Sequence, residues 1–107
     1  MMKIAVSSKG NTLDDEVDQR FGRCQYFIIL DTNDIEDFEF VENPGHSKEH
    51  AGGTTAASVV SEKGVEAVVT GNIGPKAERT LSGQGIQIYE ANGTVREAVA
   101  ALKANME

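Results

Sequence analysis

The segment Gln25–Asp31 limits the possible folds because its centre, Phe27-Ile28-Ile29-Leu30, is apolar at every position. A strand that is apolar at consecutive positions is expected to be buried on both faces. The sheet that contains it therefore needs other elements above and below it. Aromatic residues make up only 6% of the chain and Trp is absent, so the core must be built mainly from Val, Ile, Ala and Leu.

The remaining elements are predicted from periodicity, turn residues and helix caps. Strands are expected at 3–8, 25–31, 35–43, 65–70 and 86–89, and helices at 54–63, from Pro75 to Gly83, and after Thr94. In the third strand Phe38 and Phe40 share one face, and its acidic residues indicate a protected sheet edge. A hairpin-linked first half followed by βα alternation predicts an α/β fold with a mixed sheet and helices on its faces. We expect residues 1–107 to form a single domain.

The composition excludes several classes of protein. Ten basic and seventeen acidic residues give a formal charge of −7, which argues against a nucleic-acid-binding protein. The longest apolar runs are too short to span a membrane, and the chain enters its first strand without a signal-peptide pattern. The single cysteine cannot form an internal disulfide, which is typical of a reducing compartment. We therefore expect a cytoplasmic protein.

The first candidate site comprises Arg20, Arg23 and Cys24, which lie directly before the most apolar strand. A thiolate is favoured near guanidinium groups and is a natural ligand for iron in a sulfide cluster. The alternative is that Cys24 is a small buried residue and that the arginines pair with nearby acids. Spacing alone does not decide between the two interpretations.

The second candidate is the segment His46-Ser47-Lys48-Glu49-His50. Two histidines at this spacing could chelate a metal on a helix, but the flanking proline and glycines favour a loop, where both could simply be solvated. His50 precedes the start of a predicted helix, whose N-terminus attracts anions. A third candidate, the turn Gly71–Pro75, resembles a phosphate-binding loop but lacks the P-loop and dinucleotide spacings. Tight packing explains its glycines equally well.

No standard catalytic motif is present in the sequence. We find no Gly-x-Ser-x-Gly, His-Glu-x-x-His or Cys-x-x-Cys pattern. The first strand, Lys3–Ser8, also carries no carboxylate of the kind that two-metal nucleases place there. We therefore expect a protein that is not an enzyme.

Several motifs together resemble the dinitrogenase iron-molybdenum cofactor biosynthesis family, the NifX-like domains that are also fused to NifB and NafY. They are, in order, Asp18–Phe27, Glu42–Pro44, Gly52-Gly53, Gly64-Val65, Thr70–Ala77, Gly85-Ile86 and Gly93–Ala98. The resemblance covers nearly the whole chain. It implies a ribonuclease H-like α/β fold with a five-stranded mixed sheet of order 3-2-1-4-5 and helices on both faces. It also implies a cytoplasmic protein that binds, carries or helps to assemble an iron–sulfur cofactor without turnover chemistry.

The resemblance implies a binding surface on the loop after the first strand and on the histidine-bearing loop. These loops correspond here to Arg20, Arg23, Cys24 and residues 46–50. Cys24 and His50 are the expected metal ligands, possibly with His46, and Lys48 is expected to help the arginines balance the charge of the cluster. The cofactor would be an iron–sulfur cluster or a precursor of the iron–molybdenum cofactor, bound transiently.

The residue types agree with a carrier. A fixed iron–sulfur cluster is held by about four thiolates, whereas this chain has one cysteine. Few ligands permit release of the cluster to an acceptor protein, so we expect donor and acceptor proteins as partners. We expect the chain to be a monomer or weak homodimer, with no nucleic-acid or membrane partner. The alternative is a regulatory module that binds a small anion or nucleotide at Gly71–Pro75 and holds no metal cluster.

The predicted topology also makes geometric predictions. Phe21, Tyr26 and Ile28 should be substantially buried, whereas the polar segments 9–18 and 45–52 should be mobile. The antiparallel pairing of the second and third strands should bring Cys24 and Asn43 to one end of the sheet.

Overall fold

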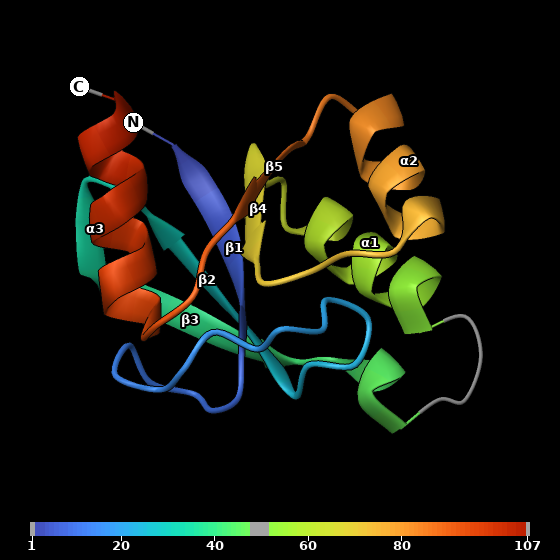
Figure 1. The fold of residues 1–107 in the computed structure, drawn as a ribbon, viewed down its shortest axis with the longest axis horizontal. Coiled ribbons are helices and arrows are strands. Elements are labelled where there is room, and N and C mark those ends of the chain that lie inside the picture. The colour runs from blue at the N-terminus through green and yellow to red at the C-terminus, as the bar shows by residue number, and fades with distance from the viewer. Residues whose placement is uncertain (1, 48–51, 107) are drawn as a thin grey trace.

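The structure, a computed structural model, describes residues 2–47 and 52–106 (Figure 1). The strands are β1 (Lys3–Ser8), β2 (Tyr26–Asp31), β3 (Asp34–Glu42), β4 (Ala67–Thr70) and β5 (Gln87–Glu90). The helices are the 3-10 helix η1 (Pro44–Ser47) and the α-helices α1 (Gly52–Glu62), α2 (Pro75–Gly83) and α3 (Val95–Met106). The strands form one sheet of order β3-β2-β1-β4-β5, which confirms the predicted order. The ribonuclease H-like classification stays a prediction.

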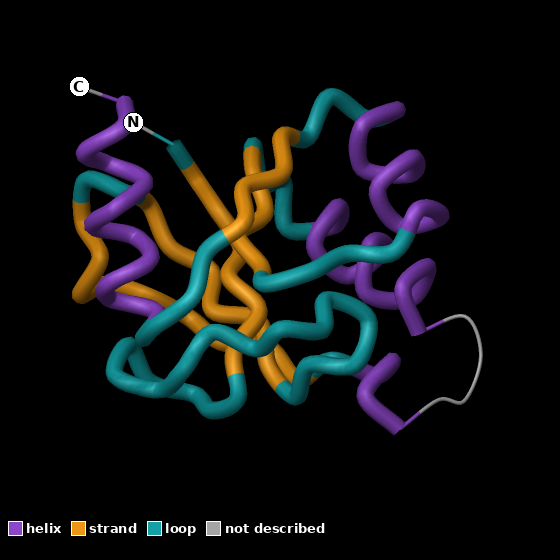
Figure 2. The backbone as a smooth tube through the Cα atoms, viewed as in Figure 1, coloured by secondary structure: helices purple, strands orange, loops and turns teal. Residues whose placement is uncertain are grey.

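The sheet is mixed because the chain runs through it in two ways. β1, β2 and β3 are joined by antiparallel pairing, whereas β4 lies parallel to both β1 and β5. Helices α1 and α2 cover one face of the sheet and α3 covers the other (Figures 1 and 2). The predicted three-layer arrangement is therefore confirmed. No helix within the described residues combines the length and the apolar character needed to cross a membrane.

Alternate residues of the central strands supply two hydrophobic clusters, one on each face of the sheet. Phe27 and Ile29 pack with the residues of α1 and α2, whereas Ile28 and Leu30 pack with those of α3. All four side chains are buried. This arrangement explains why residues 27–30 are all apolar: each of them is covered on its own face of the sheet.

The predicted capping box of α3 is present. The Thr94 hydroxyl accepts a hydrogen bond from the Glu97 amide at 3.1 Å, and the Glu97 carboxylate accepts one from the Thr94 amide at 2.9 Å. The glycine after α1, Gly64, has a φ of 69°, the left-handed conformation expected after a helix. Local sequence signals therefore set these two helix ends.

The segment 9–18 differs from the prediction of a mobile polar loop. Leu13 and Val17 are buried in the cluster beneath α3, and Val17 forms an isolated β-bridge with Ser8. These two apolar residues, too few to form a periodic pattern, anchor the segment on the core, so it is not a wholly polar loop, and its mobility stays a prediction. Phe21 and Ile28 are buried as predicted, whereas Tyr26 is only half-buried. The prediction for 45–52 falls partly on residues 48–51, which lie outside the described residues.

Candidate functional site

The site begins at the carboxyl ends of the parallel strands β1 and β4. In open α/β sheets, ligands bind at this edge where the strand order reverses. Here the chain leaves β1 toward β2 on one side and leaves β4 toward α2 and β5 on the other side. The crevice is filled by the loop over residues 18–24. The amide of Phe21 donates to the Asn72 carbonyl at 3.1 Å, and the Ser7 hydroxyl donates to the Asp18 carbonyl at 2.9 Å. The loop is therefore fixed on the sheet by hydrogen bonds from both strand ends.

The first glycine of the third candidate site, Gly71, is explained by packing against this loop, whereas Gly74 has no such neighbour. A Cβ atom at Gly71 would lie 2.6 Å from the Cα atom of Gln19, closer than side-chain atoms pack against backbone. The Gly71 amide also donates to the Asp18 carbonyl at 3.3 Å. The first residue of the turn Gly71–Pro75 is thus packed against the loop over residues 18–24.

Arg20 is anchored at its base and exposed at its tip. The buried carboxylate of Asp18 accepts a hydrogen bond from the Arg20 amide at 2.9 Å and lies 3.4 Å from Arg20 Nε. The Arg20 side chain nevertheless remains 65% exposed, so its guanidinium can meet an anionic ligand. Asp18 thus positions a residue of the candidate site, a role that sequence analysis missed. The available signal was an Asp two residues before an Arg, the spacing of an Asx turn.

Asn43 joins the two loops of the site. Its amide nitrogen donates to the carbonyl oxygens of Cys24 at 2.9 Å and Gly22 at 3.3 Å, and its side-chain oxygen accepts from the Gly45 amide at 3.0 Å. The predicted proximity of Cys24 and Asn43 at one end of the sheet is confirmed. Sequence analysis did not select Asn43 for the site, although the Asn-Pro-Gly turn was a signal for it.

Cys24 lies in the hydrophobic core rather than on the surface. Its side chain has no exposed area, packs in the cluster with Phe21 and Phe27, and lies 3.4 Å from the Phe21 carbonyl oxygen. Burial, and after it the negative charge of Asp18, raise the pKa of the Cys24 thiol to about 12. Both effects favour the neutral thiol over the thiolate. The surroundings favour the alternative interpretation of Cys24 as a small buried residue, and its role as a metal ligand stays a prediction.

His46 is held in one orientation by the neighbouring loop. Its Nδ1 atom lies 2.9 Å from the carbonyl oxygen of Arg23. A carbonyl can only accept, so Nδ1 must carry the proton and a neutral ring then presents the Nε2 lone pair. The ring is exposed and lines a hollow of about 430 Å³ together with Gln25, Glu42, Asn43 and Pro44. A backbone partner at the other ring nitrogen is the usual arrangement of a metal-ligating histidine.

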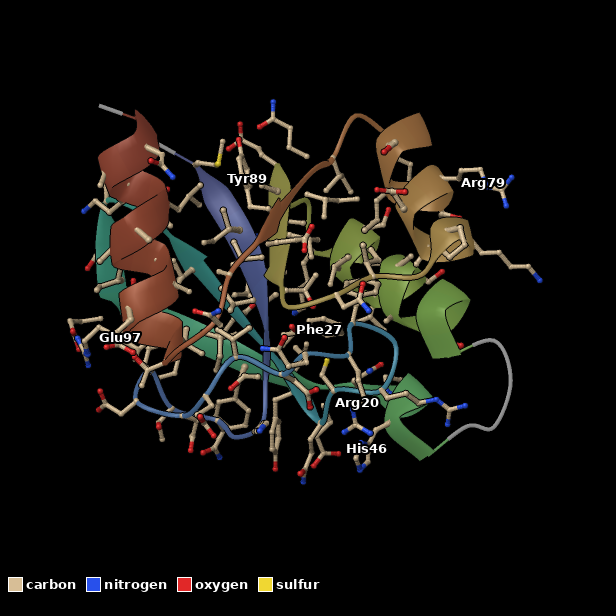
Figure 3. The ribbon with its side chains drawn as sticks, in the orientation of Figure 1. Arg20, Phe27, His46, Arg79, Tyr89 and Glu97 are labelled. Carbon is tan, nitrogen blue, oxygen red and sulfur yellow. The ribbon has the colours of Figure 1, made fainter. Side chains whose placement is uncertain are left out.

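The structure brings Arg20, Arg23, Cys24 and His46 to one end of the molecule, three at the surface and Cys24 beneath them. In Figure 3, Arg20 and His46 lie at the lower edge of the view, where the loop meets η1. Lys48 and His50 lie outside the described residues, so the predicted contact of Cys24 with His50 is not described. Over residues 2–47 and 52–106, no three His, Cys, Asp or Glu side chains form a group that could hold a metal ion.

The comparisons with known proteins assign the chain to a family. A family model described as dinitrogenase iron-molybdenum cofactor matches residues 2–105. The chain belongs to this family. This member of the dinitrogenase iron-molybdenum cofactor family is also 38% identical over 96 residues to an uncharacterised protein of Methanocaldococcus jannaschii, covering 88% of this chain and 78% of that protein.

Two solved structures are similar to this family member over nearly their whole length. The apo form of the orange protein from Desulfovibrio gigas has a TM-score of 0.91 and 35% identity, with 98% of this chain and 89% of that one covered. A candidate NifB protein from Thermotoga has a TM-score of 0.81 and 34% identity, with 97% and 89% covered. The description of the family relates the chain to the iron-molybdenum cofactor.

Proposed function

We propose that this protein binds an iron–sulfur cluster, or a precursor of the iron–molybdenum cofactor, transiently and passes it to an acceptor protein without chemical turnover. The observation that carries the proposal is the orientation of His46. Because Nδ1 is occupied by the Arg23 carbonyl, Nε2 is the nitrogen available to a metal at the surface. The cluster is the cargo of the protein and not a fixed cofactor.

The charges around His46 suit an anionic cargo. The chain as a whole is acidic, with a formal charge of −7, yet two arginines lie in the loop that contacts His46. The exposed guanidinium of Arg20 can donate hydrogen bonds to sulfide, and Lys48 and His50 follow His46 in the sequence. Cations from both loops would thus balance the negative charge of a metal–sulfur cluster.

The ligand supply suits release rather than permanent binding. Fixed iron–sulfur clusters use about four thiolates, and the one thiol of this chain is buried and protonated at neutral pH. We propose that the metal contact is made by His46, with His50 as a second imidazole, and that Cys24 supports the loop from below. The related orange protein was solved in its apo form, the form of a binding protein without its ligand.

The test is anaerobic incubation of the full chain with an isolated iron–molybdenum–sulfur cluster, followed by gel filtration with detection in the visible range. The wild-type protein should elute with the cluster. His46→Ala should weaken binding about tenfold, which corresponds to about 1.4 kcal/mol. Arg20→Ala should weaken it about threefold through the lost charge.

Arg79→Ala is the matched control, because Arg79 is an exposed arginine on α2, away from the site (Figure 3). This variant removes one positive charge, as Arg20→Ala does, and should bind like the wild type. Unchanged binding in the double variant of His46 and Arg20 would contradict the site. Failure of the wild-type chain to retain any cluster would contradict the function.

A further inference from the structure

The outer edge of β3 is an open sheet edge. β3 stands at the end of the strand order, with β2 as its one neighbour in the sheet. The amide of Asn43 donates to the Gln25 carbonyl at 2.9 Å, and hydrogen-bonded pairs recur at every second residue of an antiparallel ladder. Val41 therefore bonds to β2, whereas the backbone N–H and C=O groups of Phe40 and Glu42 point away from the sheet. These groups could pair with another strand.

An exposed aromatic side chain lies on the same edge. Phe40 is 48% exposed and is the one large apolar side chain with this degree of exposure among the described residues. Its ring meets the half-buried ring of Tyr26 edge-on, with centroids 5.8 Å apart and planes at 87°. Phe40 is paired with Ile28, so the two rings lie on the α3 face of the sheet but α3 leaves Phe40 uncovered. Such rings are enriched at protein interfaces.

The charge of β3 determines what kind of strand fits beside it. Five of its nine residues are acidic and none is basic. Glu36 pairs with Arg96 and Glu39 with Lys63, and the other three acidic residues, Asp34, Asp37 and Glu42, are exposed. A second copy of the chain paired along this edge would place like charges opposite one another, which destabilises strand pairing. A strand that carries lysine or arginine would instead gain opposite-charge pairs.

A hollow beside the edge has the same charge preference. It has a volume of about 350 Å³, and its lining includes three acidic residues, Asp31, Asp37 and Glu39, and the basic residue Lys3. Lys63 also pairs with Glu39 at 3.2 Å, so the acidic residues still outnumber the cations beside the hollow. It lies at the irregularity in the pairing of β2 with β3, where the register shifts between Ile29 and Asp31. A basic side chain from a neighbouring strand could enter it.

We propose that the outer edge of β3 binds an extended basic segment of a partner protein, which adds to the sheet as a sixth strand. An apolar side chain of this segment would cover Phe40 and Tyr26, and its basic side chains would face Asp37 and the hollow. Acidic residues alone could serve to prevent edge-to-edge aggregation, but that role does not explain an exposed phenyl ring. Glu42 also lines the hollow at His46, so the bound segment would lie beside the candidate cofactor site.

The proposal is tested with the full chain and no metal cluster, so that its outcome is independent of the proposed function. The probe is a capped nonapeptide in which lysine alternates with valine, titrated into the isotope-labelled protein and followed by NMR. We expect shift changes at residues 38–42 and slower exchange of the Phe40 and Glu42 amides. Phe40→Ala should weaken binding about fivefold, and the exposure of this ring leaves the melting temperature nearly unchanged.

A charge-matched pair of variants separates strand binding from attraction to an acidic protein. Asp37→Lys on β3 and Glu90→Lys on the opposite edge strand β5 change the net charge equally, and both residues are exposed. Asp37 lines the hollow that the basic side chains would enter, so only Asp37→Lys should weaken binding, by about fivefold. A second peptide with proline at the central valine keeps the charge but should lose the strand pairing.

Equal effects of the two Lys variants, or equal binding of the proline peptide, would overturn the proposal. Dimerisation through β3 in sedimentation equilibrium would also overturn it, because a second copy of the chain would then be the occupant.

Discussion

At the scale of single residues, the thiol of Cys24 shows how burial decides chemistry. Burial and the charge of Asp18 raise the pKa of Cys24 to about 12, above that of a thiol in the unfolded chain. The neutral thiol therefore contributes stability that is fully present below about pH 9 and is lost as the pH rises toward 12. Over this range the free energy of unfolding should fall by about 1.4 kcal/mol per pH unit because of this group alone.

The measurement compares urea unfolding of the wild type and Cys24→Ala between pH 7 and 11. All other titratable groups are the same in both proteins, so the difference between the two curves isolates the thiol. The gap in stability should narrow as the pH rises above about 9. A gap that stays constant would mean that Cys24 ionises in the folded protein as it does in the unfolded chain, and would return the thiolate to the candidate site.

The site residues differ in how far the sequence could predict them. Arg20, Arg23 and His46 were selected because their side chains have suitable chemistry and lie in the two loops that the topology brings together. Asp18 and Asn43 were missed because each acts by hydrogen bonds to the backbone of a loop, and those contacts exist only in the folded chain. The burial of Cys24 was left open for the same reason, since spacing does not reveal depth.

At the scale of elements, the first turn of α3 satisfies its amides from two sources. Val95 and Arg96 donate to the carbonyls of Asp15 and Leu13, each at 2.9 Å, and Glu97 donates to the Thr94 hydroxyl. These are among the donors that a helix N-terminus leaves without intrahelical partners. The capping box was readable from local sequence, whereas the help from the preceding loop was not, because the two segments are about eighty residues apart.

Replacing the N-cap should therefore have a limited cost. Thr94→Ala removes one of these acceptors and should lower the free energy of unfolding by about 1 kcal/mol in a urea titration. Thr80→Ala is the control, because the Thr80 hydroxyl is exposed within α2 and bonds the Lys76 carbonyl at 3.0 Å, a contact that does not favour a helix. It should be neutral or slightly stabilising. Equal losses from the two variants would mean that the cap adds nothing specific.

At the scale of the whole molecule, the segment 13–17 connects the two ends of the chain. Val17 bridges to Ser8 at the end of β1 and its amide donates to Gly93 at 2.9 Å, just before α3. Leu13 is 2% exposed and lies in the cluster between the sheet and α3. The absence of a periodic apolar pattern hid this role, since only tertiary contacts with α3 and β1 order the segment. The C-terminal helix and the N-terminal strand should consequently unfold together.

Leu13→Ala tests this coupling. Removing the buried side chain should cost about 2–4 kcal/mol, the range for leucine in a well-packed core. Glu16→Ala is the control in the same segment, because its ion pair with Lys9 at 3.6 Å is exposed and contributes little. Urea unfolding followed by circular dichroism should remain a single transition in both variants, with a large loss only for Leu13→Ala. A loss below about 1 kcal/mol, or fast hydrogen exchange at the Val17 and Val95 amides in the wild type, would mean that the segment opens independently of the core.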